Sequence, residues 1–80
     1  MLSTHAKIRM KQRGFSLNQV ELIIRYGEER HSKGAFVYTC TKKTCQHLRD
    51  CGQSLKDVEK CRGSYAVVSD GIVITVAKIH

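Results

Sequence analysis

Residues 5–14 read His-Ala-Lys-Ile-Arg-Met-Lys-Gln-Arg-Gly, and their spacing predicts the helix from which the rest of the fold can be worked out. Residues four apart share one face of a helix, so His5, Arg9 and Arg13 form a single stripe. An apolar arc borders that stripe and consists of Leu2, Ala6 and Met10. Two lysines fall on the opposite side, Lys7 and Lys11. This sorting predicts a cationic site at the edge of a core, suited to an anionic partner such as a nucleic-acid phosphate.

Capping signals predict two helices separated by a short link. Ser3 or Thr4 caps the first helix, which runs to about residue 13 and ends at Gly14. Ser16 with Gln19 matches the capping box that starts a second helix. The apolar face and the stop of that helix are Leu17, Val20, Ile23, Ile24 and Gly27. Because the link is so short, the two helices are expected to form a helical hairpin.

The middle of the chain shows turn, strand and helix signals in succession. Residues 28–34 are polar and are expected to form a turn, whereas Ala35–Cys40 is rich in aromatic and β-branched residues and predicts a strand. Residues 45–50 predict a short helix that Gly52 breaks. The next helix has a cap at Ser54 with Asp57, inward positions at Leu55 and Val58, and a stop at Arg62–Gly63.

The C-terminal residues predict a β-hairpin. Strands at 65–69 and 72–79 flank Asp70-Gly71, a favoured pair for a two-residue turn. The last strand is apolar on both faces, with Ile72, Ile74 and Val76 on one and Val73, Thr75, Ala77 and Ile79 on the other. Such a strand is expected to be central in its sheet or covered on both sides. The predicted fold class is α+β, a single domain of residues 1–80 in which the helical hairpin packs on a small antiparallel sheet, with short helices inserted before the C-terminal hairpin.

Length and charge narrow the class of protein. Eighty residues, 41% of them hydrophobic, are enough for one domain with a modest core. The net charge is +7, and residues 1–14 contain no acid, which favours nucleic acid or an acidic protein as the partner. No apolar run is long enough to span a bilayer, and the N-terminus lacks the apolar stretch of a signal peptide. We therefore expect a cytoplasmic protein without a membrane partner.

Four cysteines and a histidine suggest a zinc site at first sight: Cys40, Cys45, Cys51, Cys61 and His47. The spacing argues against it, because no C-x-x-C pair occurs and Cys40 falls in a predicted strand. We expect free thiols and no metal or cofactor, with Cys40 and Cys61 as small core residues and the other two cysteines incidental.

Two motifs carry a resemblance to a known family. Residues 5–16 follow H-A-x-x-R-M-x-x-R-G-F-S, and residues 67–76 read Val-Val-Ser-Asp-Gly-Ile-Val-Ile-Thr-Val. Together they resemble the small bacterial domain of unknown function numbered 4258, which is grouped with the RelE, ParE and BrnT toxins and their barnase-like ribonuclease fold. The resemblance implies a RelE/ParE-like arrangement and points to His5, Arg9, Arg13 and Thr75 as site residues. Residues 40–63 match the pattern poorly.

The function that these residues predict is metal-independent cleavage of RNA. His5 is the candidate base, because a neutral imidazole is favoured in the first turn of a helix. Arg9 and Arg13 bind and stabilise the phosphate. Tyr65 and His80 are candidates for the acid, and the remaining RNA-binding positions are Lys7, Lys11 and Thr75.

Two alternatives stay open at this point. The domain can be a non-catalytic module that binds RNA or an acidic, antitoxin-like protein, as one component of a toxin–antitoxin pair. The stripe can also be scaffold, with arginine stems covering the apolar arc and pairing with a carboxylate. The carboxylates available for that pairing are Glu21, Glu28 and Glu29.

Overall fold

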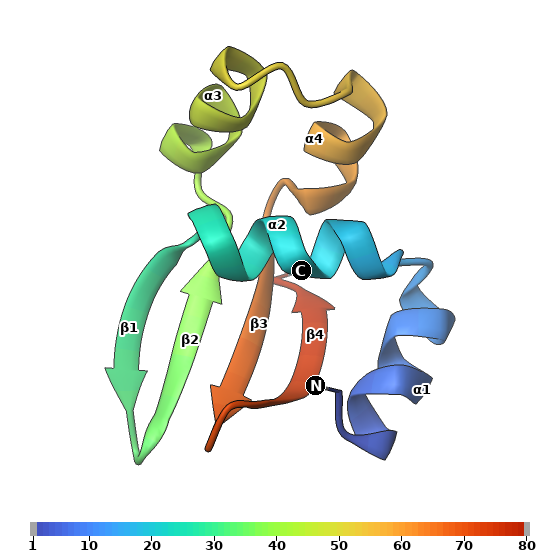
Figure 1. Ribbon diagram of the computed structural model, residues 1–80, viewed down its shortest axis with the longest axis vertical. Helices are drawn as coiled ribbons and strands as arrows, with labels where there is room; N and C mark the ends of the chain where they lie inside the picture. The colour runs from blue at the N-terminus through green and yellow to red at the C-terminus, as the bar shows by residue number, and fades with distance from the viewer. Residues whose placement is uncertain (1, 80) are drawn as a thin grey trace.

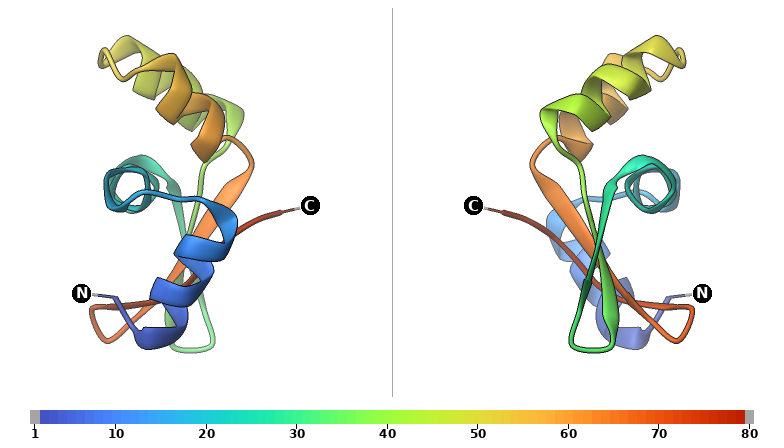
Figure 2. Two further views of the ribbon diagram at one scale, coloured as in Figure 1. Left: turned by 90° about the vertical axis from the view of Figure 1, so that its right-hand side faces the viewer. Right: turned by 90° about the vertical axis from the view of Figure 1, so that its left-hand side faces the viewer.

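The computed structural model describes residues 2–79, which adopt an α+β fold. Along these residues the elements are α1 (Thr4–Arg13), α2 (Leu17–Tyr26), β1 (Glu28–Ser32), β2 (Ala35–Thr39), α3 (Lys42–Asp50), α4 (Leu55–Cys61), β3 (Ser64–Ser69) and β4 (Ile72–Lys78). The strands form one antiparallel sheet in the order β1-β2-β3-β4. Helix α2 crosses one face of the sheet, and α1 lies beside β4 (Figure 1). Helices α3 and α4 lie beyond the end of the sheet at which β2 finishes and β3 begins. Side views show no helix of residues 2–79 on the other face (Figure 2).

Helix α1 has the predicted caps. The Ser3 hydroxyl accepts a hydrogen bond from the Ala6 N–H at 3.0 Å, and Gly14 ends the helix with a left-handed φ of 71°. Ser3 also ties the helix to the sheet, since its N–H donates to the Val73 carbonyl at 2.9 Å and its hydroxyl to the Ile74 carbonyl at 3.4 Å. The N-terminal end of α1 is therefore fixed on β4.

Helix α2 begins with the predicted capping box, in which Ser16 and Gln19 exchange hydrogen bonds of 2.9 and 3.1 Å. The predicted helical hairpin is wrong, because α1 packs along β4 whereas α2 crosses the sheet in a different direction (Figure 1). The side chain that α1 buries is Ala6, which gives too small an apolar face to pack along α2. Helix α2 buries Leu22 and leaves Leu17 exposed, the reverse of the predicted face at these two positions.

Strand β1 forms where the sequence predicted a turn. Its five residues are all exposed, so neither face shows the apolar alternation by which a strand is recognised. It pairs with β2, and the turn is confined to Lys33–Gly34. Across this pair the Tyr38 hydroxyl donates to Glu29 at 2.9 Å, and the rings of His31 and Phe36 lie 5.0 Å apart. Backbone pairing to a neighbour thus makes a strand from a polar segment.

Helices α3 and α4 fill the segment between β2 and β3. Helix α3 begins at Lys42, earlier than predicted, because the Thr41 hydroxyl accepts a hydrogen bond from the Thr44 N–H. Ser54 caps α4 as predicted. Val58 is fully buried, but Leu55 is 69% exposed and does not point into the core.

The C-terminal hairpin is confirmed, and Asp70 and Gly71 both have the positive φ that its tight turn requires. The last strand was predicted to be central or covered on both sides, and it is neither: β4 ends the sheet order with α1 beside it, and no helix of residues 2–79 covers the other face of the sheet (Figure 2). A β-bulge between Val67/Thr75 and Val68/Val73 inserts Ile74 and breaks the predicted alternation. As a result Val73 and Val76 are both buried.

The hydrophobic core lies between the sheet and helices α2, α3 and α4. Its largest fully buried side chains include Ile23, Leu48, Val20, Val58 and Val76. Each such side chain contributes about 1.5–3 kcal/mol on burial. No helix formed by residues 2–79 has the length and apolar character needed to cross a membrane.

Candidate nucleic-acid interface

The cations of α1 are displayed on two sides of the helix. We call His5, Arg9 and Arg13 the arginine flank, and Lys7 and Lys11 the lysine flank. Helix positions two apart point in nearly opposite directions, at about 100° per residue. Arg9 is half-buried, and the other four side chains are exposed. The structure therefore keeps all five candidate groups on the surface.

The lysine flank faces α2. Lys7 lines a cavity together with Leu17, Val20 and Glu21 of that helix. Sequence analysis placed the two lysines on the side away from the core, and both are exposed, but their flank borders an apolar groove rather than open solvent alone. By helical spacing the arginine flank points nearly opposite to the lysine flank, and hence away from α2.

The carboxylates proposed as partners for the arginines lie elsewhere. Glu21 is beside Lys7, on the lysine flank. Glu28 and Glu29 belong to β1, at the opposite edge of the sheet from β4 and α1. Glu29 accepts a hydrogen bond from the Tyr38 hydroxyl and raises the pKa of Tyr38. The fold thus separates Arg9 and Arg13 from the three acids that the sequence offered.

Thr75 lies on the strand that α1 packs against. It pairs with Val67, whereas its neighbour Val76 pairs with Ala66, and both members of that second pair are fully buried beneath the helices. Since strand residues alternate between faces, Thr75 belongs to the helix-free face. Tyr65 pairs with Ala77 and shares this face. Both Thr75 and Tyr65 are half-buried, while His80, the other candidate acid, lies outside the described residues.

A further cation, Lys60, adjoins the C-terminal end of α1. Its Nζ donates a hydrogen bond to the Arg13 carbonyl and lies 4.9 Å from the centre of the Phe15 ring. Sequence reasoning missed Lys60, because it is 47 residues away from Arg13 and only the packing of α4 brings it there. It extends the positive surface of α1 by one charge.

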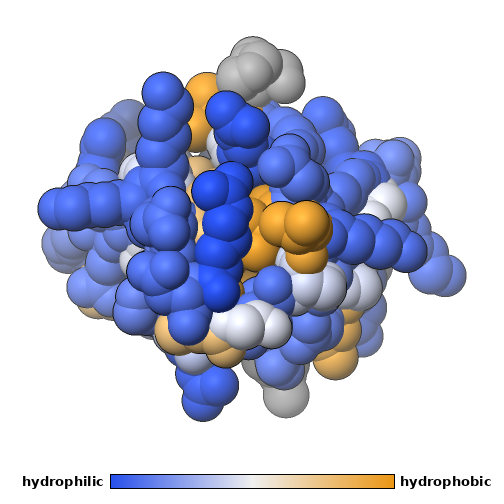
Figure 3. Space-filling model, turned by 90° about the horizontal axis from the view of Figure 1, so that it is seen from above, coloured by the Kyte–Doolittle hydropathy of each residue, from blue (hydrophilic) through white to orange (hydrophobic). Residues whose placement is uncertain are grey.

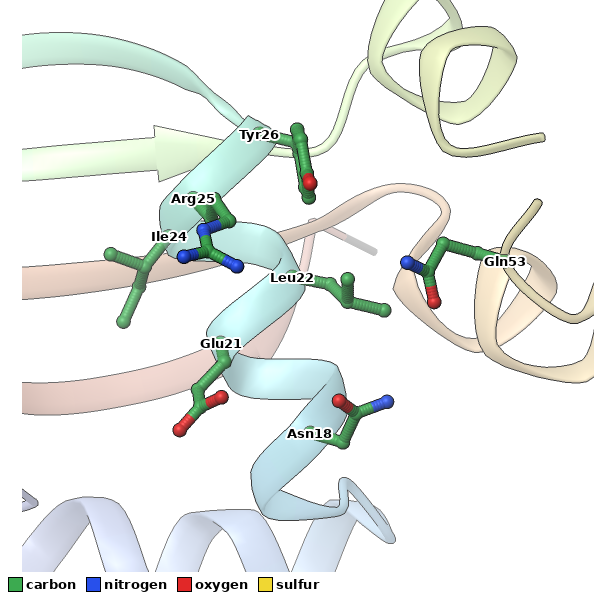
Figure 4. A pocket seen from close by; sticks show the side chains of 7 residues that line it. All are labelled: Asn18, Glu21, Leu22, Ile24, Arg25, Tyr26 and Gln53. Atoms are coloured by element: carbon green, nitrogen blue, oxygen red, sulfur yellow. The ribbon is translucent and has the colours of Figure 1, made fainter. Parts of the chain in front are cut away.

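The cavities around α2 are built from other residues. One of about 550 Å³ lies between α2 and the loop that carries Gln53, and Figure 4 shows Leu22 and Gln53 facing each other across it. Another of about 750 Å³ lies beside α3, where the rings of Tyr26 and His47 are 5.3 Å apart. From the α3–α4 end the surface is largely polar around a small apolar patch (Figure 3). The arginine flank lines neither cavity, so these candidate residues lie on the outer surface rather than in an enclosed site.

The cysteines belong mainly to the core. Cys40 and Cys61 are buried as predicted, but Cys45 is buried too, with its Sγ 3.7 Å from that of Cys40, and so is not incidental. Cys51 is exposed. Burial raises the pKa of Cys40 to about 12, with a contribution from the hydrogen bond to Cys45, and that of Cys61 to about 11. These two thiols are therefore protonated and unreactive at neutral pH.

Within residues 2–79, no three histidine, cysteine or acidic side chains are grouped closely enough to hold a metal ion. The fold and the surface define a small basic α+β domain with an exposed cationic helix. By sequence the chain belongs to a family described as a domain of unknown function (DUF4258), whose model matches residues 2–78. This match confirms the resemblance to that family. No curated protein and no solved structure matches the chain.

Proposed function

We propose that this domain binds RNA through the arginine flank, with Arg9 and Arg13 contacting phosphate groups. The observation that carries the proposal is the separation of this flank from three carboxylates: Glu21 of α2 lies beside the lysine flank, and Glu28 and Glu29 lie at the far edge of the sheet. These three carboxylates therefore do not occupy the paired N–H donors of Arg9 and Arg13, and such paired donors suit a phosphate.

The other cations of α1 support the same role. Lys7, Lys11 and Lys60 lie around the same helix, so their charges add to the attraction within a Debye length of about 8–10 Å. Thr75 offers a hydroxyl on the neighbouring strand. In this proposal the two arginines hold the phosphates, and the lysines raise the rate and the salt dependence of association.

RNA cleavage at this site is the second candidate function. His5 is exposed in the first turn of α1, one helical turn before Arg9, which is the arrangement that a base beside a phosphate-binding cation needs. Tyr65 shares the helix-free sheet face with Thr75 and is the candidate acid. The resemblance to the family grouped with the RelE, ParE and BrnT toxins supports a metal-independent ribonuclease of toxin type. An acidic, antitoxin-like protein is then the expected regulator.

Both functions can be tested in one experiment on labelled single-stranded RNA with a chelator present. Fluorescence anisotropy gives the affinity at low and at moderate salt, and gel analysis of the same samples detects cleavage. The double variant Arg9→Ala, Arg13→Ala removes the proposed phosphate ligands. The matched control is Lys42→Ala, Lys43→Ala, which removes two exposed charges from α3 at the other end of the molecule (Figure 1).

We expect the arginine variant to bind RNA about tenfold or more weakly, and its salt slope to fall by about 1 for each phosphate that is no longer bound. The lysine control is expected to stay within about twofold of wild type. Equally weakened binding in the two variants would show that only net charge matters and would contradict the proposed site.

For cleavage, we expect fragments that end in 2′,3′-cyclic phosphates, and His5→Ala is expected to abolish them with little change in affinity. A His5→Ala variant that still cleaves RNA would exclude the proposed base. Intact RNA with wild-type protein, together with salt-dependent binding, would leave the binding function and remove the catalytic one.

A further inference from the structure

An apolar groove opens between α1 and α2, on the lysine flank. One part has a volume of about 400 Å³ and is bounded by Leu2, Ile8, Met10 and Leu17, with Lys7 and Lys11 at its rim. The adjoining part, of about 370 Å³, shares Leu2, Lys7 and Leu17 and continues over Val73 towards Val20 and Ile24. The two parts meet along Leu17, so together they form one elongated depression that we call the α1–α2 groove.

The walls of this groove expose large apolar side chains on the most basic part of the chain. Ile8 is 51% exposed and Leu17 is 54% exposed. Neither residue is needed for the core, and binding of RNA phosphates would not cover them. Contiguous apolar surface with a polar rim marks a site where another molecule docks.

The charges at the rim indicate the chemistry of the occupant. Lys7 and Lys11 stand on the α1 wall, and Glu21 stands on the α2 wall. An occupant with acidic groups along α1 would pair with the two lysines, and its apolar groups would fill the groove. A second copy of this chain does not, because each copy has a net charge of +7 and would bring two more lysines to the same rim.

We propose that the α1–α2 groove binds an amphipathic helix of a partner protein. Apolar side chains of that helix at helical spacing enter the groove beside Ile8 and Leu17, and acidic side chains on its edge face Lys7 and Lys11. Because the groove is on the lysine flank, the bound helix does not cover Arg9 and Arg13, the proposed phosphate-binding side chains.

The test uses three fluorescently labelled synthetic peptides. The first places leucines at helical spacing on one face and glutamates on the others, the second replaces every glutamate with lysine, and the third has the composition of the first in a scrambled, non-amphipathic order. Each is titrated with wild-type protein and with three double variants. These are Ile8→Ser with Leu17→Ser, Lys7→Ala with Lys11→Ala, and the matched control Arg9→Ala with Arg13→Ala.

We expect the acidic amphipathic peptide to bind wild-type protein about tenfold or more tightly than the lysine and scrambled peptides. Ile8→Ser with Leu17→Ser is expected to lower that affinity about tenfold, and the lysine pair several-fold. The arginine pair removes the same charge from the opposite flank and is expected to change it less than about twofold. The substituted apolar side chains are exposed, and circular dichroism checks that each variant is folded.

Five results would overturn the proposal. The acidic peptide does not bind, or the scrambled peptide binds equally well, which would show attraction by charge alone. The arginine pair weakens peptide binding as much as the lysine pair does. Sedimentation finds a dimer of this chain that Ile8→Ser with Leu17→Ser dissociates. Vesicles of phosphatidylcholine and phosphatidylserine bind wild-type protein but not the same variant, which would identify a lipid surface as the occupant.

The assay contains no RNA, so its result is independent of the proposed function. A protein that binds the acidic peptide but no RNA would retain the groove and lose the arginine site. A protein that binds RNA but not the peptide would support the arginine site and contradict the proposed groove.

Discussion

Helices α1 and α2 have the same length and similar caps, but the fold uses them differently. Each has ten residues and begins at a serine cap. The side chain that α1 buries is Ala6, whereas α2 buries Gln19, Val20, Leu22 and Ile23. Hydrogen bonds from Ser3 to β4 hold one end of α1, while packing holds α2 along its length. Of the two helices, the one that carries the cationic surface contributes fewer buried side chains to the core. Mutations should therefore be able to change binding without changing stability.

The largest expected effect is in α2. Ile23→Ala removes a fully buried side chain and leaves a cavity, so we expect the free energy of unfolding to fall by about 2–5 kcal/mol. Leu17→Ala on the same helix removes a side chain that is 54% exposed and is expected to cost well under about 1 kcal/mol. Urea denaturation measures both. Similar costs at the two positions would contradict the packing described for α2.

In α1 the expected effect is on binding rather than on folding. Arg9→Ala with Arg13→Ala is expected to change the free energy of unfolding by no more than about 0.5 kcal/mol, while the affinity for RNA falls about tenfold. The same urea denaturation and anisotropy assays measure the two quantities. A loss of stability above about 1 kcal/mol would instead support a scaffold role, with the half-buried Arg9 stem covering the apolar arc.

Local signals in the sequence predicted most of the helices and the C-terminal hairpin. The caps at Ser3, Ser16 and Ser54 and the Asp70-Gly71 turn depend on residues next to one another in the chain, and the structure has all of them. Strand β1 could not be predicted in this way. Its exposed side chains show no pattern, and it exists because β2 offers a partner for its backbone.

The sequence also did not predict how the elements are placed relative to one another. The position of β4 at the edge of the sheet and the bulge at Ile74 depend on contacts across the fold, which periodicity does not contain. The same holds for the candidate site. The stripe of His5, Arg9 and Arg13 follows from helical spacing, but its separation from the glutamates and its proximity to Lys60 required the three-dimensional arrangement.

Mutations of the N-terminal caps should distinguish the two helices by smaller changes in stability. Ser16→Ala removes half of a capping box on the helix that carries the core, so we expect the global free energy of unfolding to fall by about 1 kcal/mol. Ser3→Ala removes a bond of similar strength from α1, and we expect it to act mainly as faster amide hydrogen exchange in Ala6–Met10. Urea denaturation and hydrogen exchange on both variants measure this. Equal global losses of stability would show that α1 unfolds together with the core.

The smallest expected effect is the contribution of the buried thiols to the pH dependence of the free energy of unfolding. It is absent at neutral pH and grows only under alkaline conditions. The pKa values of Cys40 and Cys61, about 12 and 11, lie above the ordinary thiol value of 9.0. Between these limits the folded state binds more protons than the unfolded state, so stability falls as pH rises, by at most about 1.4 kcal/mol per pH unit for each thiol. Well below the ordinary thiol value, these two thiols contribute no pH dependence.

Urea denaturation from neutral to strongly alkaline pH tests this titration with variants from both regions of the molecule. Cys40→Ala with Cys61→Ala is expected to flatten the alkaline decline, because the two groups that must lose protons on unfolding are gone. Cys51→Ala, at an exposed position, is expected to keep the wild-type profile. The Arg9→Ala, Arg13→Ala variant is expected to keep it as well, since arginine does not titrate in this range. An unchanged decline in the Cys40, Cys61 variant would show that other groups cause it and would contradict the raised pKa values of the two core thiols.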